Sequence, residues 1–471
     1  MIELYRRQRN FAEGLIAEEV SELWEGWMRH VDEVLGDQAL LGIVYEALAQ
    51  RWPMSRTRGR KGTPAEVVLR LLLLKHIRNW SYAILEREVR ANLVYRQFTR
   101  VGAEKVPDAK TLGKLGLALG PEVIEKIHQR VVAIAQEKKL VQGRKLRVDT
   151  TVVETDIHYP TDSSLLGDGV RVLTRAMKAI AQVAGAVGAK LRDRSRSVKY
   201  RLLEIGRASR GRTGQSQEKL AQAYRKLLSA TGRVVGQAKR FAREVAEGIK
   251  RSASITDQAL LEASRQYLET MIPRVQQVMR QTRERVLKDN ARVAGKIVSI
   301  FEPHTEIIRK GKAAKPTEFG KLIKVQEGEG QIITHYQVYE ERPADSDLFI
   351  PALEAHQRQL GRLPRLATAD AGFFSALNEA AAHAMGVQRV SVPNRSTKSP
   401  ERKKLQRKRW FRKAQKWRTG CEGRISLLKR RHGLNRCRYK GQPGMERWVG
   451  LGVIGDNLIN IGRALTAAAK G

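Results

Sequence analysis

Apolar residues recur at helical spacing through the first 140 residues. In the segment 63–98, Thr63 and Pro64 precede a helical pattern, and VPDAKTLGKLGLAL (106–119) begins another short helix. The apolar positions that carry the first pattern are Val68, Leu71, Leu72, Ile84, Leu85, Val89 and Leu93. Several short helices with basic residues suit a helix-turn-helix-like DNA module. A plain helical bundle explains the pattern equally well.

The pattern changes at KLRVDTTVVETDI (145–157). Its β-branched residues, Val148 and Thr150 among them, favour a strand, although Asp149 lies inside it where aspartate is disfavoured. Other strand signals and two helices follow further along the chain. Strands are expected at 296–301, 331–340, 365–370 and 387–393, and helices at 345–360 and from Ser375.

Residues 170–292 read as helical, with long amphipathic helices at 216–250 and 255–287. Without this segment, strands and helices alternate around one mixed sheet. We therefore expect an α/β (α+β) fold, in which a helical insertion interrupts the sheet core and an all-α domain precedes it. The expected parts are a DNA-binding helical domain (1–140), the core (141–169 and 293–440), the insertion (170–292) and a C-terminal helix (441–471).

The chain is strongly basic throughout its 471 residues. It has 88 Lys and Arg against 49 Asp and Glu, hence 88 − 49 = +39, and 42% hydrophobic residues, enough to build cores. Such a charge favours nucleic acid or an anionic surface as partner. We expect no membrane span, because charged residues break the leucine-rich run 65–77. Two cysteines make no disulfide framework, which fits a reducing cytoplasm.

Three carboxylates stand out against this background. Asp149 lies in the first expected strand, Asp370 ends a later strand in TADAG, and Glu422 lies among cations on a helix. Groups at strand ends project into the ligand crevice of an open sheet. A cluster of hard oxygens suits Mg²⁺ or Mn²⁺, and two such ions ~4 Å apart can clamp the oxygens of a phosphoryl displacement. Arg418 and Lys429 fall on the helix face of Glu422, where they can hold DNA phosphates.

Each carboxylate also has an ordinary interpretation. Glu422 alone reads as a surface ion-pair partner, and Asp370 as a turn residue or helix cap. Asp149 can pair with a neighbour such as Arg147, and Glu154 or Asp156 can replace it as the ligand on that strand. The order of strand Asp, strand-end Asp and helix Glu in a basic chain favours the metal site.

The chain resembles the DDE transposases of bacterial insertion sequences, which have an RNase H-like catalytic core. VDTTVV resembles the first-Asp strand, TADAGF the second-Asp turn, and the spacing of Arg418, Glu422 and Lys429 that of the third-acid helix. KPTEFGKLIKV (315–325) resembles a family segment between the second and third strands. Gln415 stands where the family often has tyrosine.

This resemblance implies a metal-dependent DNA transposase. It would bind the terminal inverted repeats of its element, free 3′-OH ends and join them to target DNA, as a homo-oligomer, a dimer in the active complex. Asp149, Asp370 and Glu422 would hold probably two Mg²⁺ or Mn²⁺ ions. The expected DNA contacts are Arg418, Lys429, Arg424, Arg430 and Lys315.

Two other functions share parts of these features. An RNase H-like nuclease or resolvase would have the same metal site without strand transfer. A non-catalytic basic DNA-binding protein needs only the charge of +39 and depends on no single carboxylate.

Overall fold

The computed structural model describes residues 1–5, 18–51, 53–185, 187–211, 213–290, 292–309 and 316–469. The chain divides into two compact units, one formed by Met1–Asp156 with Gly320–Gly471 and the other by Ile157–Phe319. The second unit contains the segment 170–292 and extends beyond it at both ends. Lys315 lies outside the described residues.

Helices form the N-terminal part of the first unit. Their bounds are α2 (Gly26–Leu35), α3 (Gln38–Gln50), η1 (Pro53–Arg56), α4 (Ala65–Ile77), α5 (Tyr82–Ala91), α6 (Leu93–Phe98), α7 (Ala109–Ala118) and α8 (Pro121–Glu137). Every residue of α4 is buried, including Arg70, which pairs with Asp32 at 2.7 Å and Glu66 at 3.1 Å. These carboxylates compensate a charge that would otherwise be costly to bury. The helical N-terminal region is therefore confirmed.

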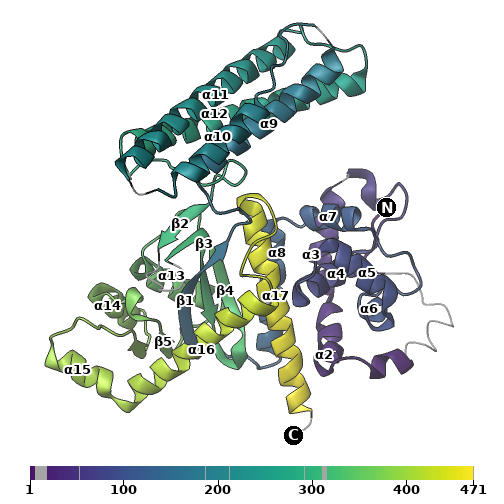
Figure 1. Ribbon diagram of the computed structural model, residues 1–471. Helices are drawn as coiled ribbons and strands as arrows, with labels where there is room; N and C mark the ends of the chain where they lie inside the picture. The colour runs from purple at the N-terminus through teal and green to yellow at the C-terminus, as the bar shows by residue number, and fades with distance from the viewer. Residues whose placement is uncertain are drawn as a thin grey trace. The chain divides into compact units, whose positions relative to one another are not determined.

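The long apolar helix α17 (Gly441–Ala468) completes the hydrophobic core of these N-terminal helices. Leu451, Ile454, Leu458 and Ile461 share one buried cluster with residues of α2, α3, α4 and α8. Figure 1 shows α17 as the yellow helix that runs from the sheet past these helices. The end of the chain is thus part of the first unit's core.

A mixed open sheet forms the centre of the catalytic half. Its strands are β1 (Lys145–Glu154), β2 (Glu306–Arg309), β3 (Thr317–Glu327), β4 (Ile333–Val338), β5 (Leu366–Thr368) and β6 (Arg389–Ser391). Their order is β2-β3-β1-β5-β6, and β4 also pairs with β3. β1 pairs antiparallel with β3 and parallel with β5, and β5 pairs parallel with β6. The predicted mixed α/β core is confirmed.

Helices cover both faces of this sheet. On one face, Leu146 and Val148 of β1 pack with Phe349 and Leu353 of α13 (Phe349–Leu360). On the other face, Val153 of β1 packs with residues of α16 (Arg409–Arg431) and α17. The alternation of side chains along β1 produces this division, because successive residues point to opposite faces. The remaining elements of this half are η3 (Glu329–Gln331), η4 (Asp345–Leu348), η5 (Ala371–Phe373), α14 (Ala376–Ala384) and α15 (Pro400–Arg407).

Two strand predictions were wrong. The apolar segment 296–301 is not a strand, because its backbone is hydrogen-bonded by side chains of a helix: Gln281 bonds both the N–H and the C=O of Ile297. The longest strand, β3, was missed because buried polar residues hide its period. Lys321 and Lys324 are both buried within it.

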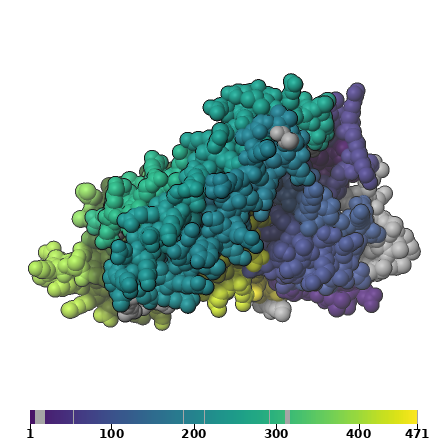
Figure 2. Space-filling model, turned by 45° about the horizontal axis from the view of Figure 1, so that its top comes forward, coloured from purple at the N-terminus to yellow at the C-terminus, as the bar shows by residue number. Residues whose placement is uncertain are grey.

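The second unit is a helical bundle. Its long helices, α9 (Asp162–Ala184), α10 (Ser195–Ala208), α11 (Gly214–Ala246) and α12 (Ile255–Thr282), lie side by side in Figure 1 and form the packed teal surface of Figure 2. The π-helical turn η2 (Arg283–Leu287) follows α12. Leu173, Met177, Leu227, Phe241 and Val275 share its core. Residues 157–319 hold 33 Lys and Arg against 15 Asp and Glu, hence 33 − 15 = +18. None of the helices in the described part of the chain is long and apolar enough to cross a membrane.

Candidate active site

Asp149 and Asp370 are brought level by the parallel register of β1 and β5. Lys145 pairs with Leu366 and Arg147 with Thr368, an offset of 221 residues. Asp149 and Asp370 differ by the same 221, so the register extended by two residues sets them side by side. Adjacent strands are about 4.8 Å apart. The two aspartates therefore stand at neighbouring positions of the sheet, on the face that α16 covers.

Asp370 begins the turn that follows β5. Its Oδ1 accepts a hydrogen bond of 3.0 Å from the N–H of Gly372, which makes it the cap of η5. The predicted capping role is thus real, and it leaves Oδ2 of Asp370 outside that bond. A carboxylate can accept several bonds, so capping and metal binding are compatible.

Asp345 is a fourth carboxylate of this region, and the sequence gave no sign of it. Its Oδ1 accepts a 3.1 Å hydrogen bond from the hydroxyl of Thr150, the residue after Asp149. A Cβ placed on Gly372 would lie 3.2 Å from Asp345 Oδ2 and 3.2 Å from Asp370 Oδ1. The two oxygens thus lie within 6.4 Å of each other, twice 3.2 Å. The local signal, an Asp before a helix, reads as an ordinary cap.

Arg418 connects Asp149 to Glu422. Its Nη1 lies 3.6 Å from Asp149 Oδ2, and its Nη2 donates to Glu422 Oε1 at 2.9 Å. Arg418 and Glu422 are four residues apart on α16, so they share a helix face. Glu422 is 61% exposed, whereas Asp149 is 14% exposed. The predicted ion pair of Glu422 exists, and the same cation also reaches Asp149.

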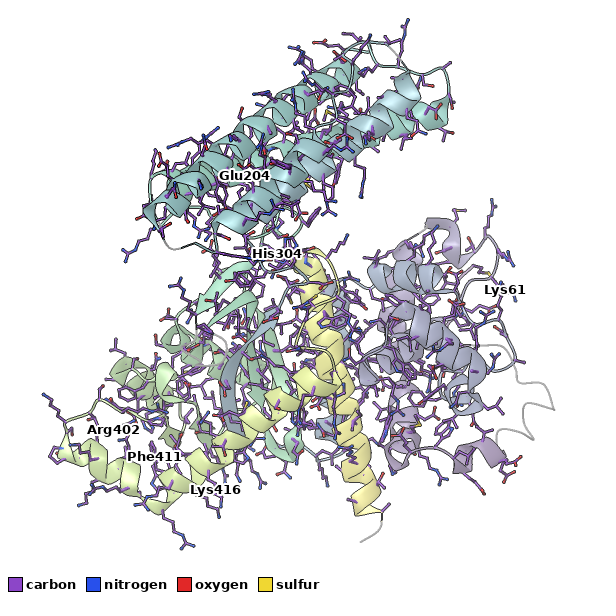
Figure 3. The ribbon with its side chains drawn as sticks, viewed as in Figure 1. Lys61, Glu204, His304, Arg402, Phe411 and Lys416 are labelled. Atoms are coloured by element: carbon purple, nitrogen blue, oxygen red, sulfur yellow. The ribbon has the colours of Figure 1, made fainter. Side chains whose placement is uncertain are left out.

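Gln415 holds α16 against the sheet. Its Nε2 donates to Ser391 O of β6 at 2.6 Å and lies 3.0 Å from Thr368 Oγ1 of β5. This residue therefore turns inward, in the position where the family often has tyrosine. On the same helix, Lys416 is exposed, and Arg402 of α15 reaches toward the ring of Phe411 with its Cζ 5.9 Å from the centroid (Figure 3).

Arg147 braces α16 against β1 from below the site. Its guanidinium binds Glu327, donates to the carbonyl of Trp417 and lies 4.8 Å from the Trp417 ring centroid. A Cβ on Gly420 would lie 2.3 Å from Arg147 Nη1, so only glycine permits this approach. Burial raises the pKa of Glu327 despite its contact with Arg147.

The alternative partners on β1 are engaged elsewhere. Arg147 pairs with Glu327 rather than with Asp149. Glu154 and Asp156 both lie near Arg436, at 3.6 Å and 3.7 Å. Burial also raises the pKa of the Cys421 thiol well above its ordinary value, so this sulfur is a neutral packing group and not a thiolate ligand.

The predicted DNA-contacting cations occupy different environments. Arg424 is 4% exposed and forms ion pairs with Asp456 at 3.1 Å and Glu327 at 3.7 Å. Its guanidinium is thus engaged inside the protein, which does not agree with a predicted DNA contact. Arg430 is exposed near the end of α16, and Lys429 is partly exposed.

The residues fit a cation between carboxylates, although no preformed metal cluster is present. Within the described ranges, no group of three or more His, Cys, Asp or Glu side chains is gathered closely enough to hold a metal ion. The cation between Asp149 and Glu422 is the guanidinium of Arg418. Their hard carboxylate oxygens, with Asp370 level with Asp149, are the donor set that Mg²⁺ and Mn²⁺ prefer.

Comparison with known families agrees with this arrangement. A family described as a transposase domain (DUF772) matches residues 27–115, the helices α2 to α7. A family described as a transposase DDE domain matches residues 383–461, which include α16 with Glu422 and most of α17. The chain matches no curated protein and no solved structure. A DDE domain implies divalent-metal chemistry on DNA, and with these two matches the chain is identified as a DDE-type insertion-sequence transposase.

Proposed function

We propose that Asp149, Asp370 and Glu422 are the catalytic carboxylates of this transposase. The observation that carries the proposal is the common register of Asp149 and Asp370, together with the bridge of Arg418 from Asp149 to Glu422. Three separate elements, β1, the turn after β5 and α16, thereby supply one carboxylate each. The carboxylates would hold Mg²⁺ or Mn²⁺, two ions in the full site.

Bound divalent ions would supply Lewis-acid stabilisation of the attacking and leaving oxygens at the scissile phosphate. The chain's own residues position the reaction. Asp149 is fixed by β1, and Asp370 by its bond to Gly372. The long, exposed side chain of Glu422 has the freedom to turn toward them. Arg418, once released from the carboxylates, can donate to phosphate oxygens without competing for metal.

Asp345 supports the same site. Its position beside Thr150 and near Asp370 adds a second negative charge at the end of β5. Such a charge raises the local attraction for a divalent ion and orients Thr150, the neighbour of Asp149. We assign Asp345 as a positioning residue for the carboxylates.

The substrate is double-stranded DNA. The reaction begins with hydrolysis at the terminal inverted repeats and ends with transfer of the 3′-OH ends to target DNA. Two ends must be cut and joined together, so the active complex is a homodimer, acting in the cytoplasm. The helices of residues 1–140 provide DNA binding, and the basic bundle that includes 170–292 adds positive charge near +18.

A cleavage and joining assay tests this function. The chain is incubated with a duplex that carries one element end, with a circular target and with Mg²⁺, and the products are resolved by size. Nicked ends together with joined molecules are expected, and Asp149→Asn should abolish both while binding persists. Cleavage without joined product would favour the nuclease or resolvase. Unchanged cleavage by Asp149→Asn would remove the proposed site.

A further inference from the structure

A basic pocket lies in the first unit beside the end of α16. It has a volume of about 440 Å³ and is formed by the start of α2, the turn after α4, the end of α16 and one side of α17. The described residues that line it include Trp27, Ile77, His432 and Ile459, with charged side chains around them. Its walls come from both segments that match transposase families.

The charge of this pocket is strongly positive. Arg78, Arg430, Arg431 and Arg463 line it, whereas Glu25 is the one carboxylate among its lining residues, so 4 − 1 = +3. Glu25 is already bound to Arg78. Arg430 donates at 3.4 Å to Ser426 O, a weak contact within its own helix. Guanidinium groups that converge in this way match the oxygens of a phosphate.

One buried donor of the pocket also lacks a partner. Arg78 Nε is inaccessible to solvent and makes no hydrogen bond with the described residues. Native proteins rarely leave such a donor unsatisfied. The next residue, Asn79, has a φ of 54°, a conformation uncommon outside glycine and often found at functional sites. Arg438 donates to the carbonyl of Asn79 at 3.4 Å and so supports this turn.

The pocket lies close to the proposed catalytic carboxylates along one helix. Arg430 and Arg431 follow Glu422 by eight and nine residues on α16. A rise of 1.5 Å per residue places them about 12–14 Å further along the helix axis. One DNA strand carries a phosphate about every 3.4 Å of its axis. A strand at Glu422 therefore needs to extend only about four nucleotides to reach the pocket.

We propose that this pocket binds a backbone phosphate of the DNA strand that is cut at Glu422. The proposal rests on the proposed function, because it takes the scissile position from Glu422. It gives Arg78, in the matched transposase domain, and Arg431, in the matched DDE domain, one shared ligand. A free nucleotide or inorganic phosphate has the same chemistry, and the experiment below separates these sources from DNA.

The test compares two double variants of the full chain. Arg431→Ala with Arg463→Ala removes two exposed pocket cations without touching the paired Arg78. Arg225→Ala with Arg240→Ala removes two exposed cations of α11 and is the control for total charge. Each protein is titrated with a duplex carrying the element end at several salt concentrations. Thermal unfolding checks that all three proteins fold alike, and calorimetry with dATP and with inorganic phosphate measures binding of the free ligands.

The pocket variant should bind DNA more weakly, and its salt dependence should flatten by about two units of slope, nearly one per lost phosphate contact. The control should keep the wild-type slope. Equal slopes for both variants would overturn the proposal, and so would tight binding of dATP or phosphate that the pocket variant alone loses. Metal-dependent cleavage by the wild-type chain is measured in parallel. If cleavage occurs and the slopes are equal, the pocket assignment fails while the proposed function stands.

Discussion

Arg418 lies 3.6 Å from Asp149 and hydrogen-bonds Glu422, so one guanidinium joins a strand carboxylate to a helix carboxylate. This contact explains how a lone glutamate is held among the cations of α16. Like charges on Asp149 and Glu422 would repel each other at close range, and a cation between them removes that cost. A cationic position between carboxylates is also what a divalent metal requires. The same residue thus has two possible partners, carboxylate and DNA phosphate.

Changing Glu422 to Gln should separate catalysis from binding. The substitution keeps the size of the side chain and removes the charge that a divalent ion needs. Cleavage should fall by at least about 100-fold, roughly 2.7 kcal/mol of transition-state stabilisation. DNA affinity should stay level or rise slightly, because a negative charge is lost from a basic surface. A Mg²⁺-dependent cleavage assay beside an end-binding titration measures both.

Glu401→Gln is the matched control for that experiment. Glu401 is exposed on α15 in the same basic region, away from Asp149. It should retain the wild-type cleavage rate. If Glu422→Gln also cuts at the wild-type rate, Glu422 is only an ion-pair partner of Arg418.

Changing Arg418 to Gln should have opposite effects on two ligands. Metal affinity should rise, because no guanidinium then competes for Asp149 and Glu422. DNA binding should weaken, and its salt dependence should flatten by about one unit. Mn²⁺ binding measured by electron paramagnetic resonance, beside the DNA titration, checks both signs. Metal affinity that falls instead would mean that Arg418 organises the carboxylates and does not block them.

Asp345→Asn tests the carboxylate that sequence reasoning missed. The amide keeps the shape but removes the charge near Asp370, and cleavage at limiting Mg²⁺ should fall by about tenfold, near 1.4 kcal/mol. High Mg²⁺ should restore part of the rate, because the lost charge acts on ion affinity. Asp347→Asn is the control, since Asp347 accepts a bond of 3.2 Å from Ser346 and lies two residues further on. A deficit that no Mg²⁺ concentration relieves would assign Asp345 a purely structural role.

The parts of the site differ in how far the sequence could predict them. β-branched residues identified β1, and a disfavoured aspartate within it drew attention to Asp149. The contact of Asp345 with Thr150 spans 195 residues and depends on the whole fold, so no local pattern reveals it. Gln415 is similar, because its polarity suggested the surface although it is bonded to two strands. The catalytic assignment of Asp149, Asp370 and Glu422 stays a prediction.

The missed strand β3 shows why local polarity misleads. Lys324 pairs in register with Thr150 of β1 and Gln337 of β4, and it is 1% exposed. Lys321 is buried too, and its Nζ donates to the carbonyl of Glu340. Both lysines look like exposed positions in the sequence. Burial of cations in a central strand is uncommon and needs the tertiary structure to explain it.

Lys324 gives a prediction about stability. Burial lowers its pKa to about 8 from the ordinary 10.5, and no carboxylate among the described residues pairs with it. Below pH 8 the lysine is charged in both the folded and the unfolded chain, so folding bears the full cost of burying the charge. Between pH 8 and 10.5 the unfolded chain binds more protons, so this cost disappears as the pH rises.

Lys324→Met should therefore raise the free energy of unfolding at pH 7 by roughly 1–3 kcal/mol. The gain should shrink as the pH rises from 8 and be nearly absent above 10.5. Urea unfolding of the variant and the wild type across this range measures the difference. Lys321→Met is the control, and it should destabilise, because it removes the donor to Glu340. A gain for Lys324→Met that stays constant with pH would show that packing, and not the buried charge, determines the stability at this position.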